Sequence, residues 1–307
     1  MRRREFIALL GGVTAWPLDA LAQRPSQIRR IGLLMIVPED DPQSRADRDA
    51  LESGLRAIGW ITGQNVDLQY RWSDGDETLL RKYAAELVTM SPDVLMTEGT
   101  AALAAVKKET KNIPTNATGF TLFEFSMATK WVEILRELLP SVKHIGFLFN
   151  AVVHAYAKLF LQAVQAAAET FKIDVKPMPV EGDAQIEHSL AVLAQQPDTG
   201  LIALHDPFII KRRDLVIAQV ARHRIPTVYT LRAFALSGGL ISYGADLADS
   251  WRQAATYVDR VLKGANPGEL PVQQPTKFEL VINRKTATAL GLNVPPALLA
   301  TADEVIE

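Results

Sequence analysis

The chain has 307 residues, enough for two domains of ordinary size, and 48 % of them are hydrophobic. The net charge is −2 and no basic stripe is present, which argues against nucleic acid as a partner. Because there is no cysteine, the sequence excludes disulfides, thiol catalysis, thiolate metal sites and a lipid anchor on an N-terminal cysteine.

The first 22 residues are predicted to be an export signal. Arg2 to Arg4 form a basic start, Ile7 to Trp16 is an apolar run too short to span a bilayer, and Ala20-Leu21-Ala22 is a typical cleavage pattern. Residues 3–7 also have the twin-arginine form that marks export of folded proteins. The alternative is an amphipathic N-terminal helix, which Pro17 and the glycines disfavour. We therefore expect a soluble, periplasmic mature protein without a lipid anchor.

The first half of the mature chain alternates strands with helices. Residues 31–37 form a continuous apolar run, as a strand buried on both faces requires. The sequence predicts further strands at 66–70 and 93–97 and helices at 45–59, 77–90 and 100–109.

The second half repeats the scheme. The sequence predicts strands at 144–149, 173–179, 200–204, 226–230, 240–243 and 278–282, and helices at 127–139, 154–171, 183–195, 211–223, 246–263 and 284–290. Such alternation indicates an α/β fold of parallel sheets covered by helices. Two such runs predict two doubly wound lobes, with a ligand site between the carboxyl ends of their strands.

The stretch "KNIPTNATGF", residues 111–120, interrupts this rhythm. No buried apolar run lies between Glu109 and Thr121, although a strand is due there. The sequence therefore predicts that the N-terminal lobe lacks one strand.

The sequence offers little for catalysis. None of the five histidines has the spacing of a metal-binding motif, and there is no nucleophile elbow, P-loop or dinucleotide-binding motif. Residues 236–240, a serine beside two glycines, are interpreted as a turn before a strand. His205 and Asp206 are adjacent, and neighbouring strand residues point to opposite faces, so this pair alone cannot build a catalytic triad. We expect no catalytic residues, no cofactor and no metal.

Polar and aromatic residues gather instead at the ends of the predicted strands, which is how small-ligand sites are usually built. The candidate ligand-binding residues are Glu98, Gly99, Thr100, Asn150, Tyr156, Asp206, Phe208, Tyr229, Tyr243 and Asp246. Glu98 is suited to an ammonium group, and the helix that Thr100 opens is suited to a carboxylate. Alternatives stay open: a solvated loop for Glu98, helix capping for Thr100 and Asp246, and core packing for the aromatic residues.

Several stretches resemble one known family. They are "MRRREFIALLGG", "AWPL", "GLRAIGWITGQNVDLQYRWSDGD", "YAAELVTMSPDVLMTEGT", "HDPF", "GGLISYGADLADSWRQAATYVDRVLKG" and "LPVQQPTKFELVINRKTATALGL". Over nearly the whole chain the sequence is similar to ABC-transporter substrate-binding proteins of the tryptophan/tyrosine-type uptake group.

The resemblance implies a type I periplasmic binding protein whose two lobes close on a small ligand, often an amino acid, and deliver it to a membrane permease. It implies an N-terminal lobe of 28–118 plus 244–275 and a C-terminal lobe of 119–243 plus 276–307, with crossings near Thr118, Tyr243 and Thr276. A monomer is expected. Relative to the family, a strand and a further segment are absent near residues 115–117, so we expect a less stable N-terminal lobe and weaker or lost binding.

Other functions stay open. The protein is alternatively a ligand sensor that partners a membrane receptor, or a truncated family member impaired in binding. An exported α/β enzyme would need a nucleophile or metal constellation that we do not find. A DNA-binding regulator of the same fold would begin with a helix-turn-helix, where this chain has its export signal.

Overall fold

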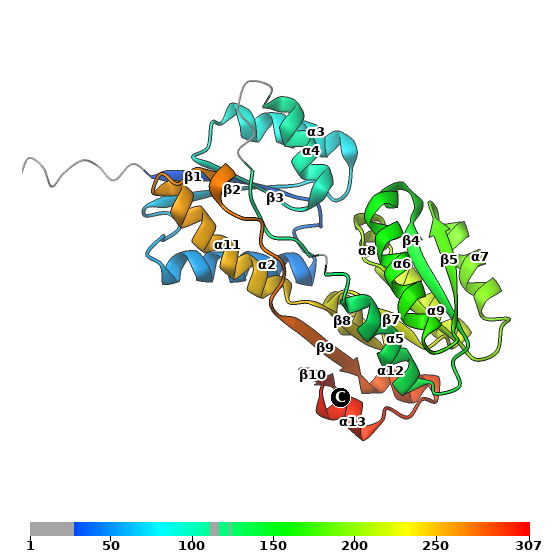
Figure 1. Cartoon of the computed structure of the whole chain (residues 1–307). Helices are drawn as coiled ribbons and strands as arrows, with labels where there is room; N and C mark the ends of the chain where they lie inside the picture. Colours follow the sequence, from blue (N-terminus) through cyan, green and yellow to red (C-terminus); the bar gives the residue numbers. More distant parts are fainter. Residues whose placement is uncertain (1–27, 111–116, 123) are drawn as a thin grey trace, which may run out of the picture.

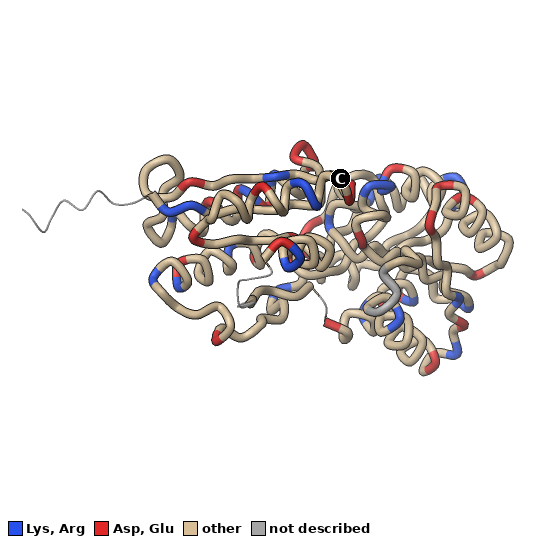
Figure 2. The backbone as a smooth tube through the Cα atoms, turned by 90° about the horizontal axis from the view of Figure 1, so that it is seen from above, with Lys and Arg blue, Asp and Glu red and all other residues tan. Residues whose placement is uncertain are grey.

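The computed structural model describes residues 28–110, 117–122 and 124–307. The predicted export signal and most of the "KNIPTNATGF" stretch lie outside these residues. The described chain forms two lobes, each a sheet with helices on both faces (Figure 1). Acidic and basic residues are interspersed along the backbone of both lobes (Figure 2).

The first lobe contains a three-stranded parallel sheet in the order β2-β1-β3. Its elements are β1 (Arg29–Met35), α2 (Pro42–Ala57), β2 (Val66–Trp72), α3 (Glu77–Thr89), β3 (Val94–Thr97), α4 (Gly99–Glu109) and, from much later in the chain, α11 (Leu247–Leu262). Alternate residues of β1 face opposite helix layers. Leu33 packs with α2 and α11, whereas Leu34 packs with α3 and α4.

A glycine sets the close approach of α2 and α11. A Cβ added to Gly54 would lie only 2.9 Å from both the Ala255 Cβ and the Arg252 carbonyl oxygen. The absence of a side chain at position 54 therefore lets α11 pack closely on α2 of the first lobe, although α11 follows a strand of the second lobe.

The second lobe contains a seven-stranded sheet in the order β10-β9-β8-β7-β6-β4-β5. Its strands are β4 (His144–Asn150), β5 (Asp174–Val180), β6 (Thr199–Ala203), β7 (Thr227–Tyr229), β8 (Ile241–Ala245), β9 (Phe278–Asn283) and β10 (Glu304–Ile306). All neighbours pair in parallel except β8 and β9, which are antiparallel. The expectation of a purely parallel sheet is wrong at this pair, because β9 returns from the first lobe in the reverse direction.

Helices cover both faces of this larger sheet. One face packs against α5 (Met127–Leu138), α6 (His154–Glu169), α12 (Arg284–Leu290) and α13 (Pro296–Ala300). The other packs against α7 (Asp183–Leu193), α8 (Pro207–Lys211), α9 (Arg213–His223) and α10 (Arg232–Leu236). Two short 3₁₀ helices, η2 (Ala151–Val153) and η3 (Pro267–Glu269), complete the described elements.

The chain crosses between the lobes after α4, after β8 and after α11 (Figure 1). The first and third crossings run side by side: the Thr121 amide donates to the Gln273 carbonyl at 2.8 Å, and the Gln273 amide donates to the Gly119 carbonyl at 2.9 Å. We propose lobe boundaries near Thr118, Tyr243 and Thr276; Thr118 and Thr276 lie within crossings, whereas Tyr243 lies inside β8, two residues before that strand ends.

In the described part of the interrupted stretch, residues 117–122 form no strand and make only an isolated bridge, Phe120 to Gln273. Phe120 packs against Tyr257 of α11, with ring centroids 5.0 Å apart. Phe125 packs at the same distance against Phe160 of α6, so the chain has entered the second lobe by that residue. The first-lobe sheet has only three strands in the described part of the chain, as the interrupted rhythm predicts.

Candidate functional site

The carboxyl edge of the first sheet faces the second lobe. Asp41, after β1, pairs with Arg213 of α9 at 3.0 Å, and Asp74, after β2, pairs with Lys211 of α8 at 3.1 Å. Both acidic residues follow strands of one lobe and both basic residues belong to helices of the other. The two ion pairs therefore place the strand ends of the first lobe against the second lobe.

Glu98 lies at this edge, directly after β3. Its Oε2 accepts hydrogen bonds from the backbone amides of Ile36 at 2.8 Å and Val37 at 3.3 Å. Burial raises the pKa of Glu98, the two amides oppose that shift, and the nearby charge of Asp41 adds to it. The alternative of a freely solvated carboxylate is wrong, because the backbone after β1 fixes this side chain.

Asp47, on α2, is a second buried carboxyl group near Glu98, and its residue is 2 % exposed. Burial raises the pKa of Asp47 to about 8, and the neighbouring charges of Glu98 and Asp41 contribute to the rise. Hydrogen bonds from Gln43, at 2.7 Å, and from Trp251 act in the opposite direction. Asp41, Asp47 and Glu98 thus form an acidic cluster in which burial and the neighbouring charges favour the protonated form of Asp47.

Arg213 supplies a positive charge to this edge. Its side chain is 14 % exposed, and Nη2 donates to Asp41. Nε and Nη1 are buried and have no hydrogen-bond partner among the described residues; the Oδ1 of Asp214 is 4.0 Å from Nε. A guanidinium with two free, buried N–H donors is suited to a carboxylate. We call Asp41, Asp47, Glu98 and Arg213 the interlobe site.

Sequence reasoning missed three of these four residues. Asp41 and Arg213 are 172 positions apart, so their contact has no local signal. The sequence offered one signal for Arg213, which is its position only a few residues after the predicted strand 200–204 and the "HDPF" turn.

Three predicted site residues of the second lobe come together at its strand ends. The carboxylate of Asp206 accepts from the amide of Asn150 at 3.1 Å and from the amide of Ile209 at 2.9 Å. Burial raises the pKa of Asp206, and burial followed by the charge of Asp206 raises the pKa of Tyr156. The Asn150 side chain accepts from the amide of Val152 at 2.7 Å. Backbone amides therefore already occupy much of the hydrogen-bond acceptor capacity of Asp206 and Asn150.

The segment after Asp206 is the short helix α8. Asp206 caps α8 and Pro207 occupies its first turn. Phe208 follows, and the Arg212 guanidinium lies over its ring, 3.7 Å from the centroid. His205, just before, is half-buried with its Nδ1 2.9 Å from the Thr230 hydroxyl, and loss of solvation lowers its pKa to about 4.

Gly99 and Thr100 are exposed at the start of α4. The helix begins at Gly99, whose φ is +76°, and Glu98 occupies the capping position without a side-chain capping bond. The expectation that Thr100 caps the helix is therefore wrong. Neither residue belongs to the interlobe site.

The remaining predicted site residues have structural roles. Tyr229 is buried and stacks on Phe234 at 4.9 Å, and Tyr243 stacks on Phe278 at 6.1 Å. Asp246 caps α11 through the amide of Asp249 and also pairs with Lys277 at 2.8 Å. Capping by Asp246 is confirmed. Core packing is likewise what the structure shows for the two tyrosines.

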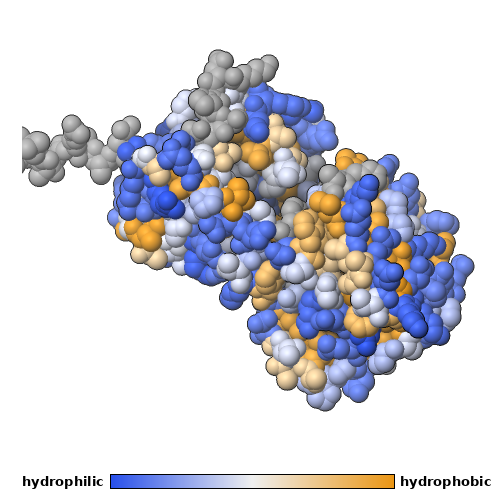
Figure 3. All heavy atoms as spheres, in the orientation of Figure 1, coloured by the Kyte–Doolittle hydropathy of each residue, from blue (hydrophilic) through white to orange (hydrophobic). Residues whose placement is uncertain are grey.

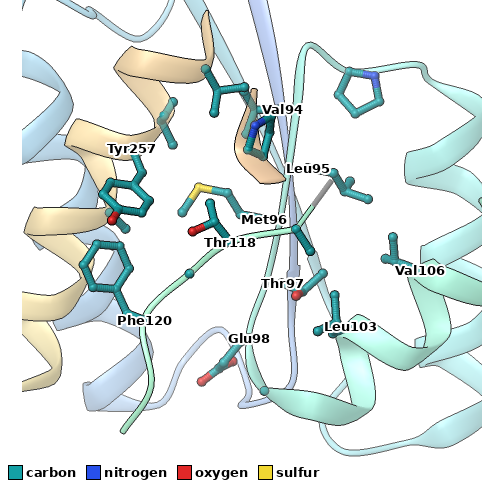
Figure 4. A pocket seen from close by; sticks show the side chains of 18 of the residues that line it. Val94, Leu95, Met96, Thr97, Glu98, Leu103, Val106, Thr118, Phe120 and Tyr257 are labelled. Atoms are coloured by element: carbon teal, nitrogen blue, oxygen red, sulfur yellow. The ribbon is translucent and has the colours of Figure 1, made fainter. Parts of the chain in front are cut away.

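A cavity of about 700 Å³ lies within the first lobe, beside β3 (Figure 4). We call it the β3 cavity. Its walls are β3, α4, α11 and residues 117–122, and they are mostly apolar. The lining side chains include Val94, Leu95, Met96, Thr97, Leu103, Val106, Thr118, Phe120, Trp251, Ala254, Tyr257 and Val258. Asp47 and Glu98 also line it, so the cavity reaches the interlobe site.

No helix of residues 28–110, 117–122 and 124–307 combines the length and apolar content needed to cross a bilayer. Over the same ranges, no group of three or more His, Asp or Glu side chains is arranged to hold a metal ion.

The chain is similar to known proteins in sequence and in fold. The family model described as "ABC transporter substrate binding protein" matches residues 114–306. A curated relative, the tyrosine-binding protein of Clostridioides difficile (strain R20291), is 21 % identical over 284 residues, which cover 86 % of this chain and 81 % of that protein.

Solved structures show the same fold over most of the chain. A conserved domain protein from Vibrio cholerae is 25 % identical with a TM-score of 0.80, covering 91 % of this chain and 100 % of that one. A protein from Streptococcus pneumonia in complex with L-Trp is 24 % identical with a TM-score of 0.79 and the same coverage. A ligand-free, open substrate-binding protein from Clostridium difficile is 18 % identical with a TM-score of 0.68, covering 91 % and 99 %.

Proposed function

The chain belongs to the ABC transporter substrate-binding protein family, and on that premise we propose that it binds an amino acid or a related carboxylate between its lobes. The observation that carries the proposal is the pairing of charges at the interlobe site. Two buried nitrogens of Arg213, Nε and Nη1, have no hydrogen-bond partner among the described residues, and Nη2 pairs with Asp41 of the acidic cluster. A zwitterion satisfies both, with its carboxylate on Arg213 and its ammonium group near Glu98 and Asp41.

Binding would act through closure of the lobes. A ligand that contacts both lobes favours the closed arrangement by its differential affinity for it. Arg213 belongs to the second lobe and Glu98 to the first, so a zwitterion held by both joins them. The paired first and third crossings provide a narrow hinge that leaves the two cores intact.

The cellular setting is part of the proposal. The predicted export signal would bring the protein to the periplasm, where it would bind its solute without chemical turnover and deliver it to an ABC permease. The names of the tyrosine-binding relative and of the L-Trp complex support an amino acid as the solute class.

Thermal melts of the full chain with a panel of amino acids and small carboxylates test this proposal. A ligand at about 100 times its Kd should add roughly 2.7 kcal/mol of stability. Arg213→Met should weaken binding at least tenfold, since a buried charge partner of the ligand is lost. Glu98→Gln should weaken the binding of amino acids but not the binding of simple carboxylates.

Lys211→Met is the matched control, because it removes a neighbouring interlobe cation whose side chain is 50 % exposed. A panel without any shift, or equal losses in Arg213→Met and Lys211→Met, would contradict the proposed site.

A further inference from the structure

The first-lobe sheet ends at an open edge. Among the described residues, β3 pairs with β1 and with no other strand, and its opposite edge lines the β3 cavity. Helix α11 covers one face of the sheet and α4 the other, so the cavity occupies the position in which a fourth strand would lie between them (Figure 4).

The cavity has the size and lining of a small-ligand site. Such sites enclose about 300–1,000 Å³, are mostly apolar, and carry a few placed polar groups. Here the volume is about 700 Å³, and Thr97, Thr118 and Ser250 supply hydroxyl groups among apolar walls. Four positions along β3 contribute to one wall, and at ~3.3 Å per residue they give the cavity an elongated shape of ~13 Å.

One end of the cavity meets the interlobe site. In Figure 4, Val94 lies at one end of β3 and Glu98 at the other. Glu98 is fixed by the amides of Ile36 and Val37, which lead directly to Asp41 and its contact with Arg213. A ligand whose charged head is held at the interlobe site can therefore extend its apolar part past Glu98 along β3.

We propose that the β3 cavity is an apolar subsite of the ligand site, and that the solute is an amino acid or amine-bearing carboxylate with a long aliphatic or aromatic tail. The head-group part of this inference rests on the proposed function. The tail part rests on the cavity alone. The expected class is thus more elongated than a compact polar amino acid, because short side chains leave the apolar walls in contact with water.

A neutral apolar probe tests the cavity without any head group. N-phenyl-1-naphthylamine should bind the full chain with saturable, one-to-one fluorescence enhancement. Leu103→Trp places an indole in the cavity from α4, at a side chain that is 38 % exposed, and should abolish this binding. Leu159→Trp is the matched control, because Leu159 is 49 % exposed on α6 of the other lobe and does not line the cavity. Equal probe binding by the two variants would overturn the subsite.

A chain-length series then tests the solute class. The ligands are α-amino acids with linear side chains, from alanine through norvaline and norleucine to 2-aminodecanoic acid, measured by calorimetry. Each buried methylene should tighten Kd by about fourfold until the cavity is filled. The gain per methylene should be lost in Leu103→Trp and kept in Leu159→Trp.

The outcomes separate this inference from the proposed function. Amino acids that bind with an affinity independent of chain length leave the proposed function standing and overturn the subsite. Probe binding abolished by Leu103→Trp, together with failure of every amino acid to bind, supports the cavity and contradicts the zwitterion site.

Discussion

The two lobes share one architecture, a sheet between helix layers, but they differ in how fully their strands are paired and buried. In the second lobe, β6 has a neighbour on each side and all five of its residues are buried. In the first lobe, β3 has a neighbour on one side, and none of its four residues is fully buried. Both strands pair in parallel with their neighbours and lie in sheets covered by helices, so the contrast follows from the edge position of β3 among the described strands.

This difference between the lobes has consequences for stability and for ligand binding. Each lobe buries one core cluster on each face of its sheet, but the two clusters of the first lobe are smaller, and a cavity lies beside its strand β3. Apolar residues also remain exposed on the outside of both lobes (Figure 3). Because stabilisation scales with the apolar area removed from water, the first lobe should unfold more readily. Its open edge is also the place where an apolar ligand gains most.

The largest expected effect is a cavity in the second-lobe core. Phe147, on β4, is fully buried and packs against Phe149 with ring centroids 5.8 Å apart. Phe147→Ala should cost about 3–5 kcal/mol, since the packing is lost and the void cannot collapse fully. Native-state hydrogen exchange should then show faster exchange at β4 and β6 amides, with β1 and β2 amides unchanged. Equal acceleration in both lobes would mean that they unfold as one unit.

The second effect concerns pH and the first lobe. In the folded protein the pKa of Asp47 is raised from 3.8 to about 8, so the folded chain holds a proton that the unfolded chain releases. This contribution is complete below about pH 4, and stability falls as pH rises from about 4 to about 8.

Asp47→Asn should flatten that slope, because asparagine keeps the shape of the side chain without its titration. Melting temperatures at pH 5, 6, 7 and 8 measure it. Asp259→Asn is the control: its carboxylate pairs with Lys263 and accepts from Trp60, and its pKa is lowered, so it should leave the slope above pH 5 unchanged. A wild-type protein with flat stability over this range would contradict the burial of Asp47.

A third, smaller effect is expected at the hinge. Asp246→Ala removes the N-cap of α11, the helix that crosses from the second lobe to complete the first, and should cost about 1 kcal/mol. Lys277→Met removes the ion pair but keeps the cap, so it should cost less. Urea unfolding compares the two. A larger loss for Lys277→Met would assign the role of Asp246 to charge and not to capping.

The sequence predicted the longer elements well because buried strands and amphipathic helices carry periodic signals over many residues. It missed α8, α10, α13 and β10, which have three to five residues each and no measurable period. For α8 a local signal was present, since Asp206 followed by Pro207 is a typical helix start. The three-stranded first-lobe sheet of the described residues agrees with the prediction made from the absent apolar run.

The candidate site was predicted less well, for a physical reason. Strand ends can be located from local pattern, and Glu98 was found in that way. The function of a strand-end residue depends on distant partners, which one sequence does not reveal. Tyr229 stacks in the core and Asp246 caps a helix, whereas Arg213 gains its role only through contact with Asp41 from the other lobe.

The smallest effect should come from the outer interlobe ion pair. Lys211 and Asp74 have side chains that are 50 % and 51 % exposed, and such pairs contribute little because water and salt screen them. Lys211→Met should therefore change the free energy of unfolding by less than about 0.5 kcal/mol, as measured by urea titration at low and high salt. The pair of Arg213 with Asp41 is better shielded, at 14 % and 9 % exposure, and should respond less to salt. A large, salt-sensitive loss of stability in Lys211→Met would contradict this ranking. It would mean that the Lys211–Asp74 pair, and not the Arg213–Asp41 pair, provides most of the electrostatic attraction between the lobes.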